Sequence, residues 1–391
     1  MAPPGRGRGE GGPACTAPRR ARHVATRPGA WYTNRALFTP EAIIVERGAE
    51  DAPMVRRCRA RAPAIPVHVV DDRRALAGDF AAAKRRLVLA PRRGSFLEHC
   101  PAGTRGVACC NYLVLHLASN CPMDCRYCFL QEYLADNAAL TAWVNPEAAL
   151  AEVGAMLDAH PERRFRVGTG ELADSLALDP LTGVSRDVVP FFAARPNALL
   201  ELKTKTAAVD DLVTLDPRDR VVVSWSLAPD AVVAAAEAGT APVAARLAAA
   251  RRVVAAGYKV GVHLDPLVEH DGWEEGYRDL VARIAAAVPA ARVAWVSMGA
   301  LRLSPGLRTR IRARFGASPL LAGEQVPGVD GKWRDLQPLR VAMYRALRGW
   351  LAEALPGVPL YLCMETPAVW ERVFGEAPPR EQLLGATLAA R

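Results

Sequence analysis

The sequence predicts an α/β protein organised as a partial (β/α)6 barrel, with a small N-terminal α/β extension and a C-terminal helical and strand extension. Strand-like apolar runs alternate with amphipathic helical patterns six times between residues 112 and 299. None of these runs alternates apolar with polar residues, which is typical of parallel strands covered by helices. A doubly wound sheet also fits this pattern, but polar residues recur at the carboxyl ends of successive runs, where parallel barrels collect their active-site groups, and this favours the barrel.

The composition is that of a large folded chain. Of 391 residues, 51% are hydrophobic and 23% are charged, which supplies a core and excludes a globally disordered protein. No apolar run approaches the roughly 18 to 20 residues that span a bilayer, so no membrane partner is expected. The nine cysteines are clustered and too sparse for a disulfide scaffold, which favours a reducing compartment and a cytoplasmic location.

Residues 1–30 are predicted to form a disordered basic tail. They are rich in Pro, Gly and Arg, and their six Arg and one Glu contribute +5 of the formal net charge of +9. The rest of the chain carries only +4, which is weak evidence for a nucleic-acid surface. The tail has no apolar core of the kind that a secretory signal needs.

Residues 31–108 are predicted to form the N-terminal extension. Its segments 42–48 and 65–72 have the composition of short strands, and 77–92 that of a helix running into a strand. The C-terminal extension, residues 301–391, is predicted to contain a helix at 336–354, a strand at 359–365 and a helix after Pro367.

Residues 109–300 are predicted to form the barrel. Apolar runs rich in β-branched residues place its strands at 112–118, 164–170, 198–205, 220–227, 258–266 and 292–299. Helical spacing of apolar residues places its helices at 146–160, 185–196, 207–213, 240–256 and 273–288. Pro146 favours a helix start, whereas Pro190 is expected to interrupt the second helix.

Three cysteines, Cys121, Cys125 and Cys128, form a C-x3-C-x2-C pattern directly after the first predicted barrel strand. A structural zinc site usually has four ligands, and no Cys or His lies within 30 residues downstream of Cys128. Three thiolates on one loop can instead hold three irons of a cubane cluster and leave the fourth iron open to another ligand. The pattern therefore favours an iron–sulfur cluster.

This pattern, with an aromatic residue before its last cysteine, resembles the signature of the radical S-adenosylmethionine (AdoMet) superfamily. The flanking sequence is similar to the spore photoproduct lyase family over roughly residues 35–375. The segments that carry the resemblance are CCNYLVLHLASNCPMDCRYCFLQEYL, GTGELADSLALD, ELKTK, VSWSL, GVHLDP, LYLCMETPAVW and the upstream run KRRLVLAPRRG. The resemblance implies a radical SAM barrel and a lyase-like enzyme.

The resemblance also implies two cofactors. Cys121, Cys125 and Cys128 would bind a [4Fe–4S] cluster, whose fourth iron would chelate the amino and carboxylate groups of AdoMet. In this chemistry the reduced cluster donates one electron, AdoMet is cleaved to methionine and a 5′-deoxyadenosyl radical, and the radical takes a hydrogen atom from the substrate. A small reductant such as flavodoxin or ferredoxin is the implied electron source. The family's substrate, a methylene-bridged thymine dimer, makes DNA the implied partner.

Several residues match positions that the superfamily uses for AdoMet. Gly168-Thr169-Gly170-Glu171 is similar to the glycine-rich motif after the second strand, which holds the methionine amino group. The glycines permit close approach of the backbone, and Glu171 can pair with an ammonium group. Lys203, at the carboxyl end of the third strand, is placed to meet the methionine carboxylate.

Five further residues are candidate contacts for AdoMet. Ser224 and Ser226 share one strand face and can hydrogen-bond a carboxylate or a ribose hydroxyl, or simply be satisfied buried serines. His263 and Asp265 share a face in the same way, and we expect them to contact adenosine or substrate, the alternative being a structural pair. Tyr127 is placed to stack near adenine, with core packing as the alternative.

One departure from the family concerns the hydrogen donor. Spore photoproduct lyases carry an extra cysteine in the second-strand segment, and RFRVGTGELADSLALDP contains none. Cys363 ends a predicted strand and is the expected catalytic substitute, whereas Cys109 and Cys110 precede the first strand and are expected at the other end of the barrel. Phe129 stands where a tyrosine would suit hydrogen relay. The chain therefore resembles a lyase-like branch of the family, and its substrate is either the thymine dimer or a different molecule.

Two other function classes stay open at this point. A zinc-binding nucleic-acid module would need no catalysis, and an iron–sulfur electron carrier would need a fourth protein ligand, either Cys363 or His116. The basic segment 302–314 can contact phosphates, or it can form a helix face paired with nearby acidic residues. We favour the helix face. Its arginines are Arg302, Arg308, Arg310, Arg312 and Arg314. Trp333 and Trp370 can stack on bases, but core packing is favoured for both.

Overall fold

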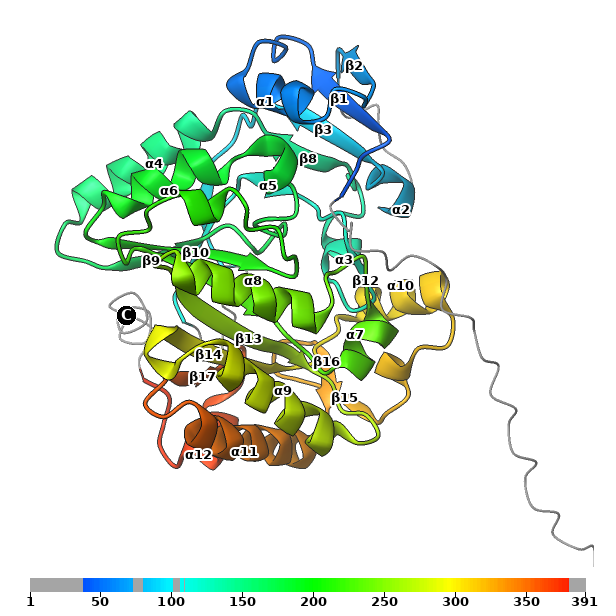
Figure 1. The fold of residues 1–391 in the computed structure, drawn as a ribbon. Coiled ribbons are helices and arrows are strands. Elements are labelled where there is room, and N and C mark those ends of the chain that lie inside the picture. Colours follow the sequence, from blue (N-terminus) through cyan, green and yellow to red (C-terminus); the bar gives the residue numbers. More distant parts are fainter. Residues whose placement is uncertain (1–37, 73–79, 101–105, 109, 380–391) are drawn as a thin grey trace, which may run out of the picture. The chain divides into compact units, whose positions relative to one another are not determined.

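The computed structural model describes residues 38–72, 80–100, 106–108 and 110–379 (Figure 1). The chain divides into two compact units, Met1–Arg35 and Ala36–Arg391, and all described residues belong to the second. The predicted basic tail lies outside the described residues. Among the described helices, none combines the length and apolarity that crossing a membrane requires.

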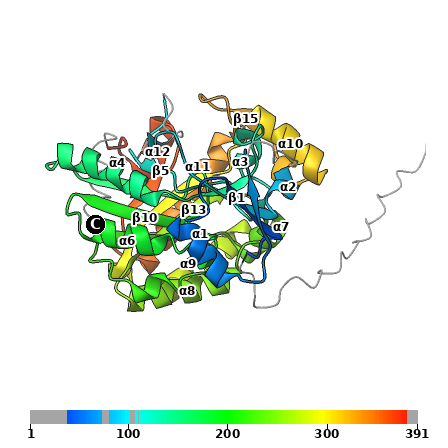
Figure 2. The same ribbon diagram turned by 90° about the horizontal axis from the view of Figure 1, so that it is seen from above.

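The barrel is a curved sheet of eight strands in which spatial order follows chain order (Figures 1 and 2). Neighbouring strands from β5 to β17 are parallel, and β4 pairs antiparallel with β5 at the other edge. The strands are β4 (Leu97–His99), β5 (Leu113–Leu115), β9 (Phe165–Gly168), β10 (Ala198–Thr204), β11 (Val221–Ser226), β13 (Lys259–Leu267), β14 (Val293–Ala300) and β17 (Leu360–Leu362). The predicted partial (β/α)6 barrel is confirmed, and β17 adds a seventh parallel strand.

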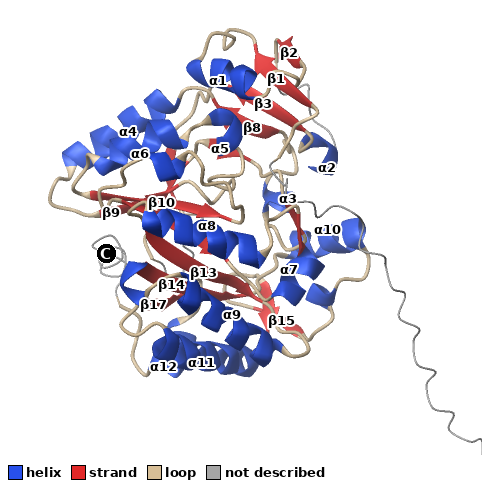
Figure 3. Ribbon diagram, in the orientation of Figure 1, coloured by secondary structure: helices blue, strands red, loops and turns tan. Residues whose placement is uncertain are grey.

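Helices cover the outer face of this sheet (Figure 3). These helices are α4 (Pro146–Ala159), α6 (Ser185–Ala193), α8 (Val243–Ala255), α9 (Trp273–Ala287), α11 (Gln337–Ala354) and α12 (Pro367–Phe374). α6 packs on β10 and β11, and α8 packs on β11 and β13. The main core lies in this layer, where Leu202 and Val223 of the strands meet Phe192, Val253 and Ile284 of the helices. Buried apolar area of this extent is the main source of the fold's stability.

A second sheet has the order β2-β1-β3-β8-β6, and β6 is the only antiparallel strand among these five described strands. Its strands are β1 (Ala42–Glu46), β2 (Val67–Val70), β3 (Arg86–Ala90), β6 (Ala118–Ser119) and β8 (Leu140–Trp143), accompanied by α1 (Pro53–Arg61) and α2 (Phe80–Ala83). Both faces of the sheet are buried, because Ile43 and Leu87 pack with α1 while Ile44 and Val88 join the main core.

The remaining helices, turns and strands complete the fold. The helices are α3 (Leu130–Tyr133), α5 (Asp179–Thr182), α7 (Asp230–Ala236) and α10 (Pro305–Phe315), with single 3-10 turns at Leu212–Thr214, Ala290–Arg292 and Pro319–Leu321. Two small antiparallel ladders join β7 (Asp124–Cys125) to β12 (Glu237–Ala238) and β15 (Gln325–Pro327) to β16 (Trp333–Asp335).

Several local predictions were wrong. The first barrel strand ends at Leu115, and residues 118–119 pair in the second sheet. Strand β8 and helix α7 had no predicted counterpart, and the helix expected at 207–213 is a 3-10 turn at 212–214. Pro190 does not interrupt its helix, because burial of Val188 and Phe192 outweighs the one backbone hydrogen bond that proline removes.

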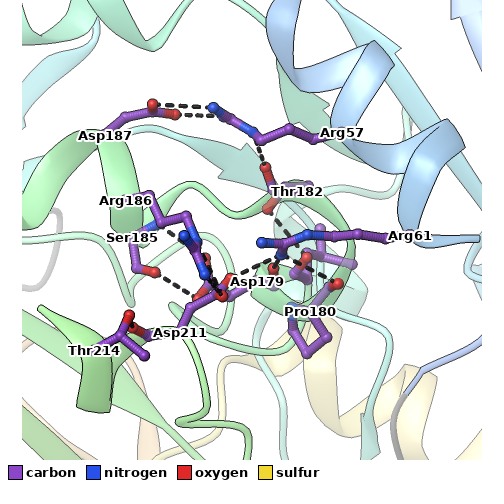
Figure 4. A network of polar contacts seen from close by, with 11 residues as sticks. Arg57, Arg61, Asp179, Pro180, Thr182, Ser185, Arg186, Asp187, Asp211 and Thr214 are labelled. Carbon is purple, nitrogen blue, oxygen red and sulfur yellow. Dashed lines mark hydrogen bonds and ion pairs between the residues drawn. The ribbon is translucent and has the colours of Figure 1, made fainter.

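An ion-pair network joins α1 to the barrel (Figure 4). Arg57 donates to the Asp187 carboxylate and to the Thr182 carbonyl oxygen, the latter at 2.8 Å. Arg61 donates to Asp211 at 2.8 Å and to backbone carbonyls of α5. These contacts fix the second sheet beside the loop that follows β9.

Candidate functional site

The three predicted cysteine ligands lie on one loop, residues 121–128, between β6 and α3; this is the cysteine loop. Cys125 is buried, and Cys121 and Cys128 are half-buried in the same small cluster. The loop is held by the β7–β12 ladder, in which Cys125 lies opposite Glu237. An additional backbone bond runs from Arg126 N–H to the Ala236 carbonyl at 2.8 Å. The loop is therefore fixed by the segment after β11 as well as by its own neighbours.

The thiols of the cysteine loop are buried enough to disfavour their ionised form. Burial raises the pKa of Cys121 to about 12, and it raises the pKa values of Cys125 and Cys128 as well. Backbone N–H groups of Met123 and Leu130 donate to the sulfurs of Cys121 and Cys128 and oppose this rise in pKa. Thiols in such a setting become thiolates when a metal replaces the proton, since the ligand is the deprotonated sulfur.

The donor set consists of three thiols, the number that a cubane cluster takes from the protein when its fourth iron is left open. Throughout the described ranges, no three Cys, His, Asp or Glu side chains converge as the ligands of one metal ion would. The three thiolates of a cubane cluster bind three different irons and share no single coordination sphere. His116, one candidate for a fourth ligand, lies 3.2 Å from the Glu98 carboxylate.

Sequence reasoning missed the carboxylate that supports the loop. Glu237 is buried and accepts hydrogen bonds from Tyr127, from Lys205 at 2.8 Å and from Arg246 at 2.6 Å. Burial opposes ionisation, but Lys205 and Arg246 lower the pKa of Glu237 to about 2. Tyr127, predicted near adenine, is thus anchored by its hydroxyl, and the Lys205 ammonium lies 5.6 Å from its ring centroid. The antiparallel pairing of Glu237 with Cys125 has no local sequence signal that could have revealed it.

The glycine-rich motif after β9 is packed against the chain itself. A Cβ at Gly168 would lie 1.7 Å from the Tyr112 hydroxyl oxygen, and a Cβ at Gly170 would lie 2.7 Å from the Cβ of Lys203. Glycine is therefore required at both positions by close contacts. Contact of these two residues with AdoMet stays a prediction.

Glu171 and Lys203 form an ion pair, with 3.4 Å between the Lys203 ammonium and the Glu171 carboxylate. Burial alone would lower the pKa of Lys203, but Glu171, Glu201 and Asp265 raise it above its usual value. The predicted partners of the methionine carboxylate and ammonium thus lie together and carry opposite charges.

The interior of the barrel contains a buried polar network centred on Glu201. Its carboxylate accepts from Arg166 at 2.6 Å and from Ser224 at 2.5 Å, and it lies 2.7 Å from His263 Nε2. Arg166 also donates to the Tyr361 hydroxyl at 3.1 Å. Ser224 and His263 therefore both meet the Glu201 carboxylate, whereas the structural alternative for His263 had been a pair with Asp265, which instead accepts from Arg302. Ser226 is buried nearby on the same strand, and its carbonyl oxygen accepts from Arg246 at 2.8 Å.

Burial and the Glu201 carboxylate set the protonation of His263. Burial lowers the pKa of His263 more than Glu201 raises it, so the ring is neutral near pH 7. Because Glu201 is ionised, with Arg166 lowering its pKa despite burial, Nε2 of His263 carries the hydrogen. Nδ1 is then a hydrogen-bond acceptor.

Asp265 and Cys363 lie together at the carboxyl end of the sheet. Arg302 donates to the Asp265 carboxylate at 3.0 Å and to the Cys363 carbonyl oxygen at 3.1 Å. Burial raises the pKa of the Cys363 thiol well above its usual value, and Asp265 adds to the rise. Cys110 is not remote from Cys363 as its position before β5 had suggested, because the Ala108 N–H donates to the Glu365 carbonyl oxygen at 2.8 Å, two residues from each cysteine.

The basic segment at 302–314 is mainly a helix, α10. Arg302 and Arg314 pair with Asp265 and Asp124, as the favoured interpretation expects. Arg310 and Arg312 are exposed on α10. Trp370 is buried in the core, and the Arg308 guanidinium lies 4.2 Å from the ring centroid of Trp333.

A partial (β/α)6 barrel whose first strand leads into a C-x3-C-x2-C loop is the combination that defines the radical SAM superfamily. The family model of spore photoproduct lyase matches residues 76–303, more than half of the chain. The chain belongs to the spore photoproduct lyase family.

Individual relatives agree with this assignment. The chain is 31% identical over 169 residues to the spore photoproduct lyase of Geobacillus sp. (strain Y412MC61), a match that covers 43% of this chain and 50% of that protein. It is 30% identical over 172 residues to that of Bacillus subtilis (strain 168), covering 44% and 50%. The chain thus spans about half the length of the curated relatives it matches.

Solved structures are similar in fold. A spore photoproduct lyase complexed with dinucleoside spore photoproduct superposes with a TM-score of 0.74 at 22% identity, covering 83% of this chain and 99% of that one. A mutant lyase with bound AdoMet and dinucleoside spore photoproduct gives the same values. At this identity, the likeness establishes the fold.

Proposed function

We propose that this protein is a radical SAM enzyme that binds a [4Fe–4S] cluster through Cys121, Cys125 and Cys128, and AdoMet beside Glu171 and Lys203. The observation that supports the proposal is that the three thiols share one small buried cluster, on a loop held by both β7–β12 pairing and the Glu237 network. When bound, the two cofactors would supply one-electron reductive cleavage of AdoMet and a radical able to take hydrogen from a substrate.

The charges beside the loop suit the methionine end of AdoMet. The AdoMet ammonium can pair with Glu171, and the AdoMet carboxylate can pair with Lys203. The single Glu171–Lys203 ion pair of 3.4 Å is then replaced by two ion pairs with the ligand. The neutral His263 presents Nδ1 as an acceptor for a hydroxyl donor such as ribose. Asp265, Ser226 and Tyr127 stay candidate contacts of the same ligand.

The substrate we propose first is a thymine-dimer lesion in DNA, with a different molecule as the alternative. Support comes from family membership and from the solved relatives that bind dinucleoside spore photoproduct. The alternative is retained because the second-strand segment lacks the cysteine donor. Cys363 is the proposed replacement, since it lies beside Asp265 and Arg302 at the carboxyl end of the sheet.

We further propose that a small reductant such as flavodoxin or ferredoxin supplies the electron, and that the protein works in a reducing compartment, the cytoplasm. The support is chemical, because thiols that bind a cluster must stay reduced until iron is delivered.

The test starts from protein reconstituted anaerobically with iron and sulfide. We expect a brown protein that, with dithionite, converts AdoMet to methionine and 5′-deoxyadenosine. A Cys125→Ala protein should lose both the cluster and the cleavage, and full cleavage by this variant would refute the proposal. Ultraviolet-irradiated dry DNA and other nucleic acids are then supplied separately, and mass spectrometry reads restored thymine or deuterium exchange into AdoMet.

A further inference from the structure

Strand β17 and helix α12 are joined by a short turn, residues 363–366. Met364, in this turn, has a φ of 57°, a left-handed backbone conformation that costs free energy for a residue with a Cβ. A residue is held in such a conformation only where the surrounding structure fixes the backbone, and such residues cluster at functional sites. Met364 directly follows Cys363, so the contacts that hold it also hold the proposed hydrogen donor.

The backbone of Cys363 is fixed at both of its polar groups. Its N–H donates to the Met298 carbonyl oxygen at 2.7 Å, which extends the pairing of β17 with β14 by one residue. Its carbonyl oxygen accepts from Arg302 at 3.1 Å, and the Arg302 guanidinium also donates to the Asp265 carboxylate at 3.0 Å. The thiol is therefore attached to a backbone that cannot leave the sheet edge without breaking one of these bonds.

Glu365 fixes the turn on the other side of Met364. Its side chain is 1% exposed, and its carboxylate accepts from Arg340 Nε at 2.9 Å and from the Tyr344 hydroxyl at 2.9 Å. Both donors belong to α11 and are themselves buried. The carbonyl oxygen of Glu365 accepts from the Ala108 N–H at 2.8 Å. Glu365 thus ties the turn to α11 through its side chain and to the segment before β5 through its backbone.

Stability alone does not account for this arrangement. A buried ion pair such as Arg340–Glu365 contributes little to stability, because apolar residues of similar volume at the same place are often as stabilising or more so. The left-handed conformation of Met364 is a further cost. Directional hydrogen bonds to a carboxylate instead define one position for the chain. The turn keeps a single geometry although it costs free energy, as expected where a side chain must be presented accurately.

Hydrogen transfer from a thiol depends strongly on where the sulfur lies. In the proposed step the S–H bond of Cys363 breaks, a C–H bond forms on the product radical, and the unpaired electron moves to the sulfur. The reacting atoms must be in near contact, and a misplacement of about 1 Å can cost a factor of about 100 in rate. A residue that sets the position of the Cys363 backbone therefore controls this step without touching the substrate.

We propose that Glu365 is a positioning residue, which fixes Met364 in its left-handed conformation and thereby holds the Cys363 thiol in place at the carboxyl end of the sheet. Arg340 and Tyr344 hold Glu365 itself. This inference rests on the proposed function, because Cys363 is the hydrogen donor proposed there. Glu365 does not belong to the Glu171–Lys203 pair, so AdoMet cleavage is expected to continue without it.

The first test is alkylation of the reconstituted protein with iodoacetamide, with the rate at each cysteine measured by mass spectrometry. In Glu365→Gln the Cys363 thiol should react about tenfold or more faster than in the wild type, because the turn opens locally. Cys58, buried in the core of the second sheet, reports global opening, and its rate should change far less. Glu46→Gln, which alters a buried glutamate of β1, is the matched control and should leave the Cys363 rate at the wild-type value.

A double variant separates positioning from stability. Arg340→Met/Glu365→Leu replaces the buried ion pair by apolar side chains, so its thermal unfolding should stay near that of the wild type. Its Cys363 thiol should still react about tenfold or more faster, because the hydrogen bonds that fix the turn are gone. A wild-type alkylation rate in this variant overturns the inference. If the double variant does not fold, Tyr344→Phe decides, since it removes one donor to Glu365 and keeps the ion pair; an unchanged rate overturns the inference there too.

The second test compares two activities of Glu365→Gln. AdoMet cleavage with dithionite is expected to continue, whereas the thymine restored per AdoMet cleaved from ultraviolet-damaged DNA should fall about tenfold or more. An equal loss of both activities would overturn the positioning role. A wild-type protein that cleaves no AdoMet or restores no thymine would instead refute the proposed function, and the alkylation rates would still decide whether Glu365 holds the thiol.

Discussion

Arg166 and Glu201 form an ion pair inside the barrel, with 2.6 Å between Nη2 and Oε2 and both side chains almost fully buried. Glu201 also meets Ser224 and His263, so one carboxylate organises the barrel interior. Removing one member of a buried ion pair leaves the charge of the other uncompensated, and this destabilises the folded protein.

Glu201→Ala is expected to destabilise the protein by about 3–5 kcal/mol, because it leaves the Arg166 guanidinium buried without a counter-charge. Urea unfolding followed by circular dichroism measures the change. The control is Asp216→Ala, which removes an exposed ion pair with Arg218 and should cost less than about 1 kcal/mol. Equal effects of the two substitutions would contradict the buried ion pair.

The stability of the protein should fall as the pH drops below about 6.5, in part because of His263. Burial lowers the pKa of His263 in the folded state, so the unfolded histidine binds a proton first and acid favours unfolding. His263→Gln is expected to flatten the change in the free energy of unfolding between pH 7 and 5. The lowered pKa values of Glu201 and Glu237 act in the same direction at lower pH, below their unfolded pKa of about 4.3. An unchanged slope in the His263 variant would show that the ring titrates normally.

Gly168→Ala should cost about 3 kcal/mol or more, since the new Cβ would overlap the Tyr112 ring. Gly349→Ala is the matched control, because it lies in α11 with no atom within 4 Å of the new Cβ, and it should stabilise the protein by about 0.5–1 kcal/mol. Thermal unfolding measures the change in stability of both variants. Adding Tyr112→Leu to Gly168→Ala should recover part of the loss, and strict additivity would contradict the contact.

The contact between α1 and α6 can be measured with Arg57→Ala, Asp187→Ala and the double variant. Their side chains are about a quarter exposed and share two hydrogen bonds, so we expect a coupling energy of about 1 kcal/mol. A coupling near zero would assign the docking of α1 to its apolar contacts alone.

Cys363→Ala should separate the two halves of the proposed chemistry. AdoMet cleavage with dithionite is expected to continue, whereas productive turnover of an ultraviolet-damaged DNA substrate should fall about tenfold or more. High-resolution mass spectrometry of AdoMet and of thymine products measures both. Normal turnover would remove Cys363 from the reaction.

The barrel strands were predictable because each is a long apolar run between helical patterns. The cysteine loop was predictable because its spacing is local. Strand β8 was not, since its four residues acquire strand geometry by pairing with β3, which is remote in sequence, and with the two-residue β6. Glu237 and Lys84 were missed for the same reason, because only the tertiary fold brings them to the cysteine loop. For Ser224 and His263, sequence periodicity gave the strand face but not the Glu201 carboxylate that they meet.

Strand β8 also has a consequence for the order of synthesis. The N-terminal strands leave the ribosome first, yet their sheet receives β6 only after β4 and β5 of the barrel sheet have been made, and it receives β8 only after the cysteine loop. The cysteine loop is therefore synthesised while both sheets are still incomplete. Deleting residues 38–100 would remove β3, one of the two neighbours of β8, together with the Lys84 contact to the Met123 carbonyl of the loop, so the early segment cannot be trimmed away like an appended tag.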